Sequence, residues 1–448
     1  MVSNLTWAGF LVLVTLSVSF AEPSWKFIVT SDSQGRDDGL NALILGEIAS
    51  EIVKHDVDLV LFSGDLVYGN DENLEGRLTW WREVMEPVYD ANIAVYPCRG
   101  NHDSSGSKSI WQKVFSDLPD NGPAGEKHMT YSVIHKNALI VALDEYSVER
   151  HQVNQSWLDG QFAANRQPLV FVFGHTPAFQ AYHDDCLDDY PEKRDIFWAG
   201  LRNAGARTYF CGHDHFYDHA RVDDGDGDPN NDIHQYIVGT AGANFYSFTP
   251  PYDGNNGDYT VEQWYHQAWY GYVLVEVDGL DVTLSWMERY MISPDGEWGY
   301  QANEVWTYTV PPARMTVVSP NGGESLVAGS ECEIRWETNE DPNIEYVLIE
   351  YSTDNGQNWS QVDTVTNLGA YEWIVPMVDS NECLMRVSDL NDPMTRDTSN
   401  AVFTIFRCQG PVAGDVNGDC YVDSLDLAAL VPHWLECGNP FDTNCALE

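Results

Sequence analysis

Short apolar runs that stop abruptly on polar residues organise the first half of the chain. One run covers residues 25–31 and stops at Asp32, and another covers 58–63 and stops at Gly64-Asp65. Between them, apolar residues recur at three- and four-residue spacing, at Leu40, Leu43, Ile44, Ile48, Ile52 and Val53. This spacing predicts an amphipathic helix between two buried strands. The strand-helix-strand order is typical of α/β domains, which bind ligands beyond the carboxyl ends of their strands.

The same arrangement repeats along the chain. Three further helical patterns each lead into an apolar run, at 93–97, 169–173 and 208–211. Two apolar runs between residues 131 and 143 flank His135-Lys136-Asn137 and predict a hairpin, so we expect a mixed sheet. More strands are predicted at 235–238, 272–277, 282–287 and 305–310.

The pattern changes near Pro311-Pro312, which we interpret as a linker. Apolar and polar residues then alternate in five short runs, over 332–336, 346–351, 371–375, 384–387 and 402–405. This period of two predicts a small all-β sandwich. The expected organisation is therefore a domain at 22–312, a β-sandwich at 313–407 and a tail at 408–448.

The N-terminus has the pattern of an export signal. Residues 7–21 are an apolar run that ends in Ser19-Phe20-Ala21, although no Lys or Arg precedes it. The run suits a signal peptide at 1–21 and is too short to span a bilayer comfortably. We therefore expect a secreted or cell-surface protein whose mature part has no membrane span.

The charge balance restricts the partners. The chain has 69 acidic and 23 basic residues, a formal net charge of -46. Nucleic acid is an unsuitable partner, because no basic surface is available to displace counterions from its phosphates. An anionic substrate must instead be attracted locally, by bound cations.

The nine cysteines are unevenly distributed. Cys98 and Cys211 precede polar blocks on buried strands and are expected to be small core residues. Cys332 and Cys383 lie on predicted strands of the β-sandwich, and we expect a disulfide between its sheets. The remaining tail cysteines are expected to pair among themselves, and they are Cys408, Cys420, Cys437 and Cys445.

Candidate metal ligands stand at the ends of the predicted strands of the first domain. They are Asp32, Asp65, Asn101, His175, His213 and His215. Oxygen and imidazole donors in this mixture suit first-row divalent metals better than calcium or a thiolate zinc site. Neighbouring glycines allow the backbone to turn sharply so that the side chains converge. A carboxylate at a strand end, such as Asp65, can bridge two adjacent metals.

The chain resembles the calcineurin-like metallophosphoesterases in five ordered blocks: Asp32-x-Gln34, Gly64-Asp65, Gly100-Asn101-His102-Asp103, Gly174-His175 and Gly212-His213-x-His215. The resemblance covers roughly residues 24–310. It implies a four-layer α-β-β-α sandwich with a dinuclear site for Mn, Fe or Zn.

The resemblance also assigns the ligands. It implies that Asp65 bridges the two metals and that Asp32 and His215 belong with the first of them. The second metal belongs with Asn101, His175 and His213. His102 matches a histidine that is not a ligand and protonates the leaving oxygen, or stabilises its charge. We expect Asp103 to orient His102.

The first block departs from the commonest pattern of the family, because Gln34 stands where a His is usual. A Gln carbonyl can bind a metal, but as a neutral and weaker donor. The block Gly64-Asp65-Leu-Val-Tyr68 is similar to one in purple acid phosphatases, whose Tyr binds ferric iron. The first metal is therefore held by Gln34, by Tyr68 or by neither, and we favour Gln34.

Two metals about 3.5 to 4 Å apart acidify a bridging water and hold a phosphoryl group for in-line attack. We predict hydrolysis of phosphomonoesters or phosphodiesters by a metal-bridging hydroxide, without a covalent phosphoenzyme. The alternative hypothesis is a weak or inactive phosphatase-like scaffold that serves as a surface or matrix binding protein. Aromatic residues after the last block can line a cleft or belong to the core, and they include Phe245, Tyr246, Trp264, Tyr265 and Trp269. The histidines interpreted as surface or structural are His183, His219, His234 and His266.

Two segments have the acidic spacing of calcium loops. The segment 224–232 alternates acidic residues but lacks a closing acid, so we interpret it as a solvated hairpin tip. The tail places oxygen donors at all six loop positions, at Asp415, Asn417, Asp419, Tyr421, Asp423 and Asp426. A helix is expected to follow, giving an EF-hand-like loop and helix.

The accessory parts also resemble known modules. Residues 352–359 and 371–376 resemble immunoglobulin-like domains of secreted proteins. The tail resembles one half of a dockerin type I module, with Cys420 at the usual Gly position. It implies a bound calcium ion and a cohesin-like or surface scaffold partner.

Overall fold

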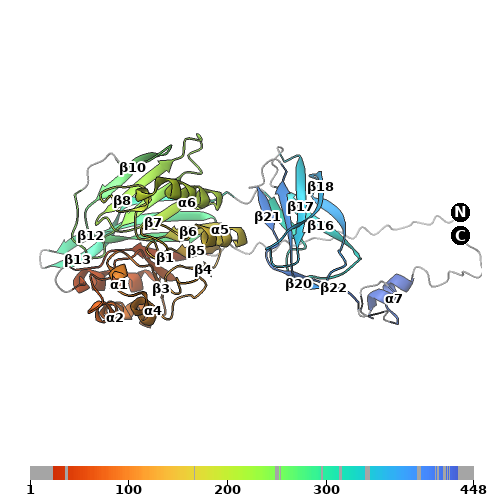
Figure 1. Ribbon diagram of the computed structural model, residues 1–448, viewed down its shortest axis with the longest axis horizontal. Helices are drawn as coiled ribbons and strands as arrows, with labels where there is room; N and C mark the ends of the chain where they lie inside the picture. The colour runs from red at the N-terminus through yellow and green to blue at the C-terminus, as the bar shows by residue number, and fades with distance from the viewer. Residues whose placement is uncertain are drawn as a thin grey trace, which may run out of the picture. The chain divides into compact units, whose positions relative to one another are not determined.

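The computed structural model describes most of the chain between residues 24 and 431 (Figure 1). The positions within this span that it leaves out are 36–38, 166, 248–251, 253, 294–295, 312–314, 339–343, 391–394, 409, 411–412, 417–419, 421 and 423. The predicted signal peptide at 1–21, Cys437 and Cys445 lie outside the described residues.

The described chain separates into two compact units. The first contains the residues up to 153 together with 171–195 and 207–309. The second contains 154–170, 196–206 and the residues from 310 onward. The linker predicted at Pro311-Pro312 falls near the last of these divisions.

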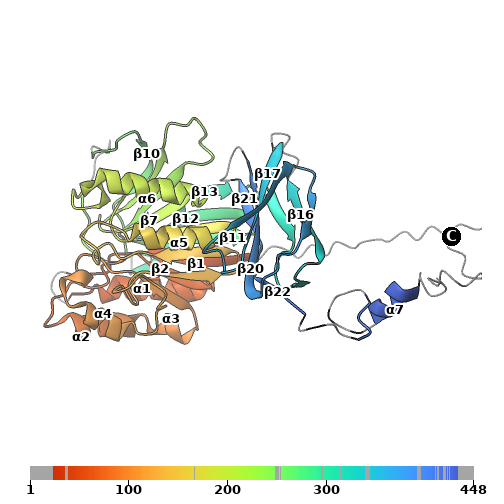
Figure 2. The same cartoon turned by 45° about the vertical axis from the view of Figure 1, so that its right-hand side comes forward.

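The first unit contains a six-stranded sheet in the order β13-β12-β11-β1-β2-β3. Its strands are β1 (Ser24–Thr30), β2 (Leu59–Phe62), β3 (Ala94–Pro97), β11 (Gly271–Asp278), β12 (Asp281–Ser293) and β13 (Glu297–Thr309). Strands β1, β2 and β3 are parallel, and β11 pairs antiparallel with β1. The helices gathered on one side of this sheet, labelled in Figure 2, are α1 (Ala42–His55), α2 (Leu74–Val84), α3 (Glu86–Asp90) and α4 (Lys108–Val114).

A second, seven-stranded sheet has the order β10-β8-β9-β7-β6-β5-β4. Its strands are β4 (Tyr131–His135), β5 (Ala138–Ala142), β6 (Leu169–Phe173), β7 (Thr208–Cys211), β8 (Tyr217–Asp223), β9 (Ile233–Val238) and β10 (Thr260–Gln267). Strands β6, β7 and β9 are parallel, whereas β4 and β5 form the predicted antiparallel hairpin. The chain passes through α5 (Gln155–Ala164) and α6 (Pro191–Asn203) before β6 and β7 respectively. The expectation of a mixed α/β fold is confirmed.

An aromatic core joins the two sheets of this unit. Phe27 of β1 packs edge-on against Phe171 of β6 at 4.9 Å between ring centroids, and against Phe210 of β7 at 6.5 Å. Strands β2, β6 and β7 are buried at every residue, as expected for parallel strands covered on both faces. Helix α1 buries Ile44, Ile48 and Ile52 and leaves Leu43 exposed. The strand ends that carry the candidate ligands thus extend from buried, closely packed strands.

The second unit contains β-sandwich sheets, as predicted. One has the order β14-β16-β19 and the other the order β15-β22-β20-β17-β18, with β21 paired to β20. Their strands are β14 (Met315–Ser319), β15 (Ser325–Val327), β16 (Glu331–Thr338), β17 (Tyr346–Ser352), β18 (Ser360–Thr366), β19 (Ala370–Ile374), β20 (Ser380–Asp389), β21 (Arg396–Thr398) and β22 (Phe403–Phe406). Buried side chains from both sheets form one core around Trp336 and Trp373.

The disulfide predicted between the sheets of the sandwich is wrong. Cys332 of β16 and Cys383 of β20 are free thiols. Each sulfur approaches a carbonyl of its own strand region, Glu333 O at 3.9 Å and Ser380 O at 3.6 Å respectively. Apolar side chains fill the space between the sheets, so alternation alone placed the cysteines on facing sheets without bringing their sulfurs together.

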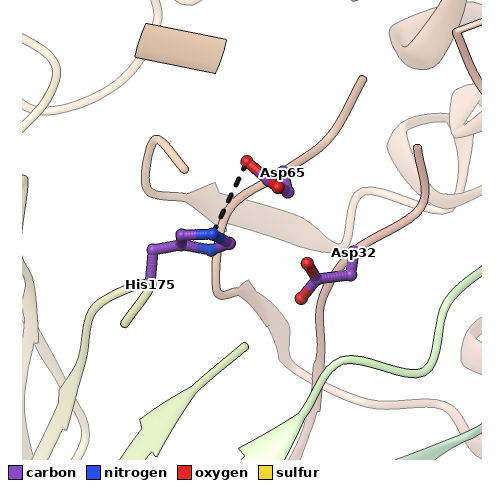
Figure 3. A group of neighbouring side chains, drawn as sticks. All are labelled: Asp32, Asp65 and His175. Atoms are coloured by element: carbon purple, nitrogen blue, oxygen red, sulfur yellow. Dashed lines mark ion pairs between the residues drawn. The ribbon is translucent and has the colours of Figure 1, made fainter. Parts of the chain in front are cut away.

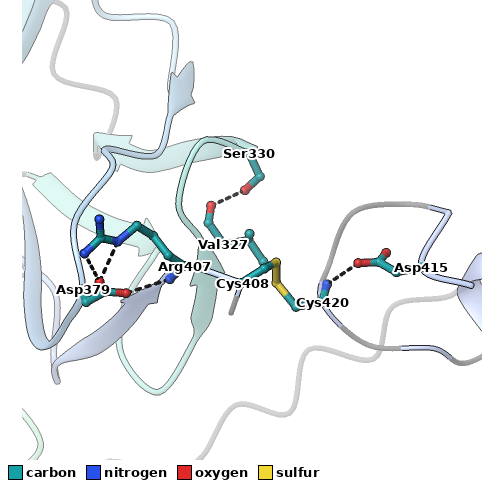
Figure 4. The surroundings of a disulfide bond; sticks show 7 residues. All are labelled: Val327, Ser330, Asp379, Arg407, Cys408, Asp415 and Cys420. Atoms are coloured by element: carbon teal, nitrogen blue, oxygen red, sulfur yellow. Dashed lines mark hydrogen bonds and ion pairs between the residues drawn. A yellow bond between two sulfur atoms is a disulfide. The ribbon is translucent and has the colours of Figure 1, made fainter. Parts of the chain in front are cut away.

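The tail contains a disulfide and a short helix, α7 (Ser424–Leu430). Cys408 and Cys420 are bonded, which gives one of the pairings expected in the tail (Figure 4). Asp415 Oδ2 accepts a hydrogen bond from Cys420 N at 2.9 Å, and Asp426 Oδ1 accepts one from Val416 N at 2.7 Å. The other predicted calcium ligands lie outside the described residues, and they are Asn417, Asp419, Tyr421 and Asp423. No helix in the described part of the chain has the length and apolar character needed to cross a bilayer.

Candidate metal centre

The loops after β1, β2 and β7 carry three candidate ligands in an unusual backbone conformation. Asp32, Asp65 and His213 have φ values of 60°, 50° and 69°, in the left-handed region that residues with a Cβ rarely adopt. Backbone hydrogen bonds from Asp32 N to Gly64 O and from Ser33 N to Asp65 O, both 3.1 Å, hold the first two loops together. The strained turns direct these side chains toward one point.

Three buried side chains meet at that point (Figure 3). Asp32, Asp65 and His175 each offer one ligand atom, and the three atoms lie within 4.8 Å of one another. His175 Nε2 lies 3.5 Å from Asp65 Oδ1. The structure therefore contains a candidate metal site formed by residues from the ends of three strands.

Two further predicted ligands lie on the Asp32 side. His215 Nε2 is 3.4 Å from Asp32 Oδ1. Gln34 Nε2 is 3.0 Å from His215 Nε2 and 3.0 Å from Asp65 Oδ2. We refer to Asp32, Gln34 and His215 as the first ligand group. Rotation of the Gln34 amide by about 180° would exchange its oxygen and nitrogen, so that the carbonyl oxygen would face His215 Nε2 and Asp65 Oδ2.

The remaining predicted ligands form the second ligand group, Asn101, His175 and His213. Asn101 Oδ1 lies 3.0 Å from His175 Nε2 and 3.1 Å from His213 Nδ1. Asp65 contacts both groups, through Gln34 on one side and His175 on the other. The structure thus brings all seven predicted ligands together in two groups with Asp65 between them.

The surroundings of these groups fit cations. His175 Nδ1 faces Ser63 O at 2.8 Å and His215 Nδ1 faces Asn244 O at 2.7 Å, so each Nε2 can present a lone pair to the site. Asp32 Oδ1 and Gln34 Oε1 are buried acceptors without a hydrogen-bond donor. Because buried acceptors are almost always satisfied, a bound cation accounts for both atoms.

The region that carries these residues is similar to known proteins. Residues 26–217 match the family model of the calcineurin-like phosphoesterases. The chain is thus similar to that family over residues 26–217, which are less than half of its length. The chain is 23% identical over 324 residues to human tartrate-resistant acid phosphatase type 5, with 63% of this chain and 94% of that protein aligned. The mouse protein of the same name is 24% identical over 210 residues, with 40% of this chain and 62% of that protein aligned. A solved dimetal phosphatase from Danio rerio is 14% identical, with a TM-score of 0.43, and the alignment covers 65% of this chain and all of that one.

The electrostatics of the two ligand groups also favour bound cations. Burial raises the pKa of Asp65 well above its usual range, and the charges of Asp32 and Asp103 add to the effect. Burial lowers the pKa of His175 to about 3, which keeps this imidazole neutral and able to bind a metal. Although burial opposes it, the nearby imidazoles of His215 and His175 lower the pKa of Asp32 to about 2. A bound cation would therefore favour the charged form of Asp65, which burial disfavours.

His102 and Tyr68 lie at the edge of the site. His102 Nε2 is 3.8 Å from Asp65 Oδ2, and 31% of its side chain is exposed. The Tyr68 ring lies over the His102 ring with 4.5 Å between centroids, and Tyr68 is 47% exposed. Gln34 is thus within the ligand set, whereas Tyr68 lies beside the predicted acid.

Among the described hydrogen bonds, the Asp103 carboxylate binds backbone groups and not the His102 ring, so its predicted orienting role stays a prediction. The buried Asp103 carboxylate accepts hydrogen bonds from the backbone N–H groups of Leu66, Val67 and Gly100, at 3.1, 3.3 and 3.0 Å. It therefore joins the loops after β2 and β3. Backbone donors are available at every residue, so adjacency in sequence could not reveal that Asp103 binds them in place of the imidazole.

The role of Asp214, the residue between His213 and His215, was not predicted from the sequence. Asp214 is fully buried and accepts hydrogen bonds from Tyr182 N at 2.9 Å, His183 N at 3.1 Å and His183 Nδ1 at 2.6 Å. His183, interpreted from sequence as surface or structural, is thereby held with its ring 4.7 Å from that of His213. An acid inside the His-x-His block was the one signal that could have suggested this.

Of the aromatic residues that were predicted to line a cleft or belong to the core, one lies beside the candidate metal ligands. The Tyr246 ring stacks on His215 at 4.3 Å and on Tyr182 at 4.8 Å between centroids. By contrast, Trp264 and Tyr265 have their described ring contacts with residues of β8, β9 and β13, and Phe245 with Trp269 and Tyr270. Tyr246 alone of the five named aromatic residues contacts a predicted ligand among the described rings.

Proposed function

We propose that the protein is a phosphoesterase that binds two transition metals and hydrolyses phosphomonoesters or phosphodiesters by attack of an activated water. The observation that carries the proposal is the arrangement of two ligand groups on either side of Asp65. The match of residues 26–217 to calcineurin-like phosphoesterases supports metal-dependent phosphoester hydrolysis. The arrangement of sheets and helices in this domain is consistent with the four-layer α-β-β-α sandwich implied by the resemblance.

The first ligand group and Asp65 would hold one cation, and the second ligand group and Asp65 the other. When bound, two such cations acidify a water nucleophile and neutralise the phosphoryl oxygens. Mn, Fe or Zn suits these oxygen and imidazole donors. Gln34 is preferred over Tyr68 as a ligand, because its amide already lies 3.0 Å from His215 and Asp65.

His102 is the proposed acid for the leaving oxygen. Its partly exposed ring stands at the boundary between Asp65 and solvent, where the alcohol product must depart. Although burial lowers the pKa of His102 to about 4, the negative charge of a bound phosphate ester favours the protonated imidazole. His183, fixed by Asp214, provides a second imidazole beside the site, which would donate to a phosphoryl oxygen in its protonated form.

Replacement of His102 by Ala is expected to reduce turnover by about 10²- to 10⁴-fold, the usual contribution of a general acid. Metal content should stay at the wild-type level, because His102 belongs to neither ligand group. Tyr68→Phe is the matched control, since it removes only a hydroxyl beside His102 and should change neither quantity. A phenolate-to-iron absorption band that disappears in Tyr68→Phe would instead assign Tyr68 as a ligand.

Metal analysis combined with parallel assays on an aryl phosphate and a bis-aryl phosphate tests the proposed function. We expect two transition-metal ions per chain and turnover of at least one substrate. Hydrolysis in ¹⁸O-labelled water should place the label in the phosphate, and no phosphate should pass to an added alcohol. A chain with no bound transition metal and no turnover would support the alternative, a phosphatase-like scaffold that only binds.

The parts of the chain outside the metal-binding domain are proposed to determine where the protein is located. We retain the boundaries 22–312, 313–407 and 408–448 for the three parts, with an immunoglobulin-like module in the middle. An export signal at 1–21 would make the protein secreted or attached to the cell surface. The tail would bind calcium and dock to a cohesin-like or other scaffold partner, with the Cys408–Cys420 disulfide securing its loop to the preceding strand region.

A further inference from the structure

The three candidate histidine ligands differ in what binds their outward nitrogen. His175 and His215 each face a backbone carbonyl through Nδ1. His213 differs, because its Nε2 lies 3.1 Å from Oδ1 of the Asp185 carboxylate. A carboxylate on the outer nitrogen of a metal-binding histidine fixes the tautomer and makes the inner nitrogen a stronger donor.

The Asp185 side chain contacts His213 although it is not buried. Its side chain is 52% exposed, whereas that of His213 is 5% exposed. The preceding residues Tyr182 and His183 are fixed by three hydrogen bonds to the buried Asp214 carboxylate. Asp214 directly follows His213, so the segment that carries Asp185 is attached to the same turn as the histidine it contacts.

The charges of the two ligand groups show what Asp185 adds. The first ligand group has its own carboxylate, Asp32. The second ligand group consists of one amide and two imidazoles, which are uncharged donors when they bind a metal, and it has only a share in Asp65. A divalent cation in the second position therefore has less negative charge among its direct ligands. The Asp185 carboxylate, one imidazole away, supplies that charge without occupying a ligand position.

We infer that Asp185 is a positioning residue for His213 and sets the affinity of the second ligand group for its metal. This inference rests on the proposed two-metal function and deepens it. Removing the carboxylate weakens the metal held by the second ligand group by about 10- to 100-fold, the usual effect of losing an outer partner of a ligand. The metal held by the first ligand group keeps its affinity, because Asp185 contacts none of its members in the described structure.

Calorimetric titration of the metal-free full-length protein with Mn²⁺ tests the inference. The wild-type chain is expected to bind two ions, and Asp185→Asn should show one weakened and one unchanged binding step. Asp184→Asn is the matched control, because Asp184 is exposed, adjacent and without a side-chain hydrogen bond or ion pair in the described part of the chain. It removes the same charge and should leave both steps unchanged. Asp185→Glu should recover most of the lost affinity.

The outcomes separate the inference from the proposed function. If wild type, Asp184→Asn and Asp185→Asn all bind two ions with the same two affinities, the role of Asp185 is overturned and the proposed function still stands. Equal weakening in both Asn variants would also overturn it, since a general surface charge would then be responsible. A folded wild-type chain that binds no ion would overturn both. Circular dichroism of each variant confirms the fold, which an exposed Asp-to-Asn change is expected to preserve.

Discussion

Asp65→Asn is expected to lose at least one metal ion and to reduce turnover by about 10³-fold or more. Asp65 is the residue that both ligand groups contact, through Gln34 at 3.0 Å and His175 at 3.5 Å. Lewis-acid stabilisation by a metal is worth several kcal/mol in the transition state, and each 1.36 kcal/mol is a factor of ten in rate. The neutral amide of Asn cannot replace the negative charge of the carboxylate that lies between the two ligand groups.

The same substitution has the opposite effect on the metal-free protein. Because burial raises the pKa of Asp65 in the folded state, metal-free wild type loses stability as pH rises from the unfolded pKa through the folded one. Asn has no proton to lose, so metal-free Asp65→Asn should unfold at an equal or higher temperature than metal-free wild type at neutral pH. Differential scanning calorimetry with and without Mn²⁺ measures both effects. A variant that is less stable without metal would point to a packing role for Asp65 instead of a metal role.

Gly100→Ala is the second substitution with a large expected effect, although it changes no ligand. A Cβ at this position would lie 2.0 Å from Asp65 Oδ1 and 2.5 Å from Asp65 N. Because these atoms belong to a buried and hydrogen-bonded loop, the carboxylate must move. A misplacement of about 1 Å can lower turnover by roughly 100-fold, and overpacking costs about 1–3 kcal/mol of stability.

Gly76→Ala in helix α2 is the matched control for this substitution. No atom lies within 4 Å of its added Cβ. Alanine should stabilise this helix by roughly 0.5–1 kcal/mol and leave turnover unchanged. Metal content, steady-state kinetics and thermal unfolding of both variants decide the comparison. Wild-type turnover and two bound ions in Gly100→Ala would contradict the central position of the Asp65 carboxylate.

The sequence predicted the strands that matter for the site because they are short, apolar and buried on both faces. Strands β2, β6 and β7 begin and end within about one residue of the predicted runs. Polar residues at their ends mark the ligand edge of the sheet, and all seven predicted ligands do meet there. Strand β10 was missed, because its half-exposed sequence lacks a continuous apolar run.

Contacts that involve backbone groups or distant loops could not be predicted. The binding of Asp103 to three N–H groups, and of Asp214 to the segment at 182–183, requires the relative positions of loops that are far apart in the chain. Cys332 and Cys383 are a case in which a predicted contact is not formed. Strand alternation placed the two residues on facing sheets, but disulfide formation depends on the separation of their Cβ atoms, which alternation does not determine.

The left-handed backbone at Asp32, Asp65 and His213 lowers the stability of this domain while placing three side chains that are candidate metal ligands. Each such residue is expected to cost about 1–3 kcal/mol relative to a relaxed backbone, and glycine would relieve most of that cost. Selection for stability alone would therefore remove these three side chains, yet all three are present as metal-binding types. A drift toward glycine at these positions in a related chain would mark the conversion of an enzyme into a more stable, inactive fold.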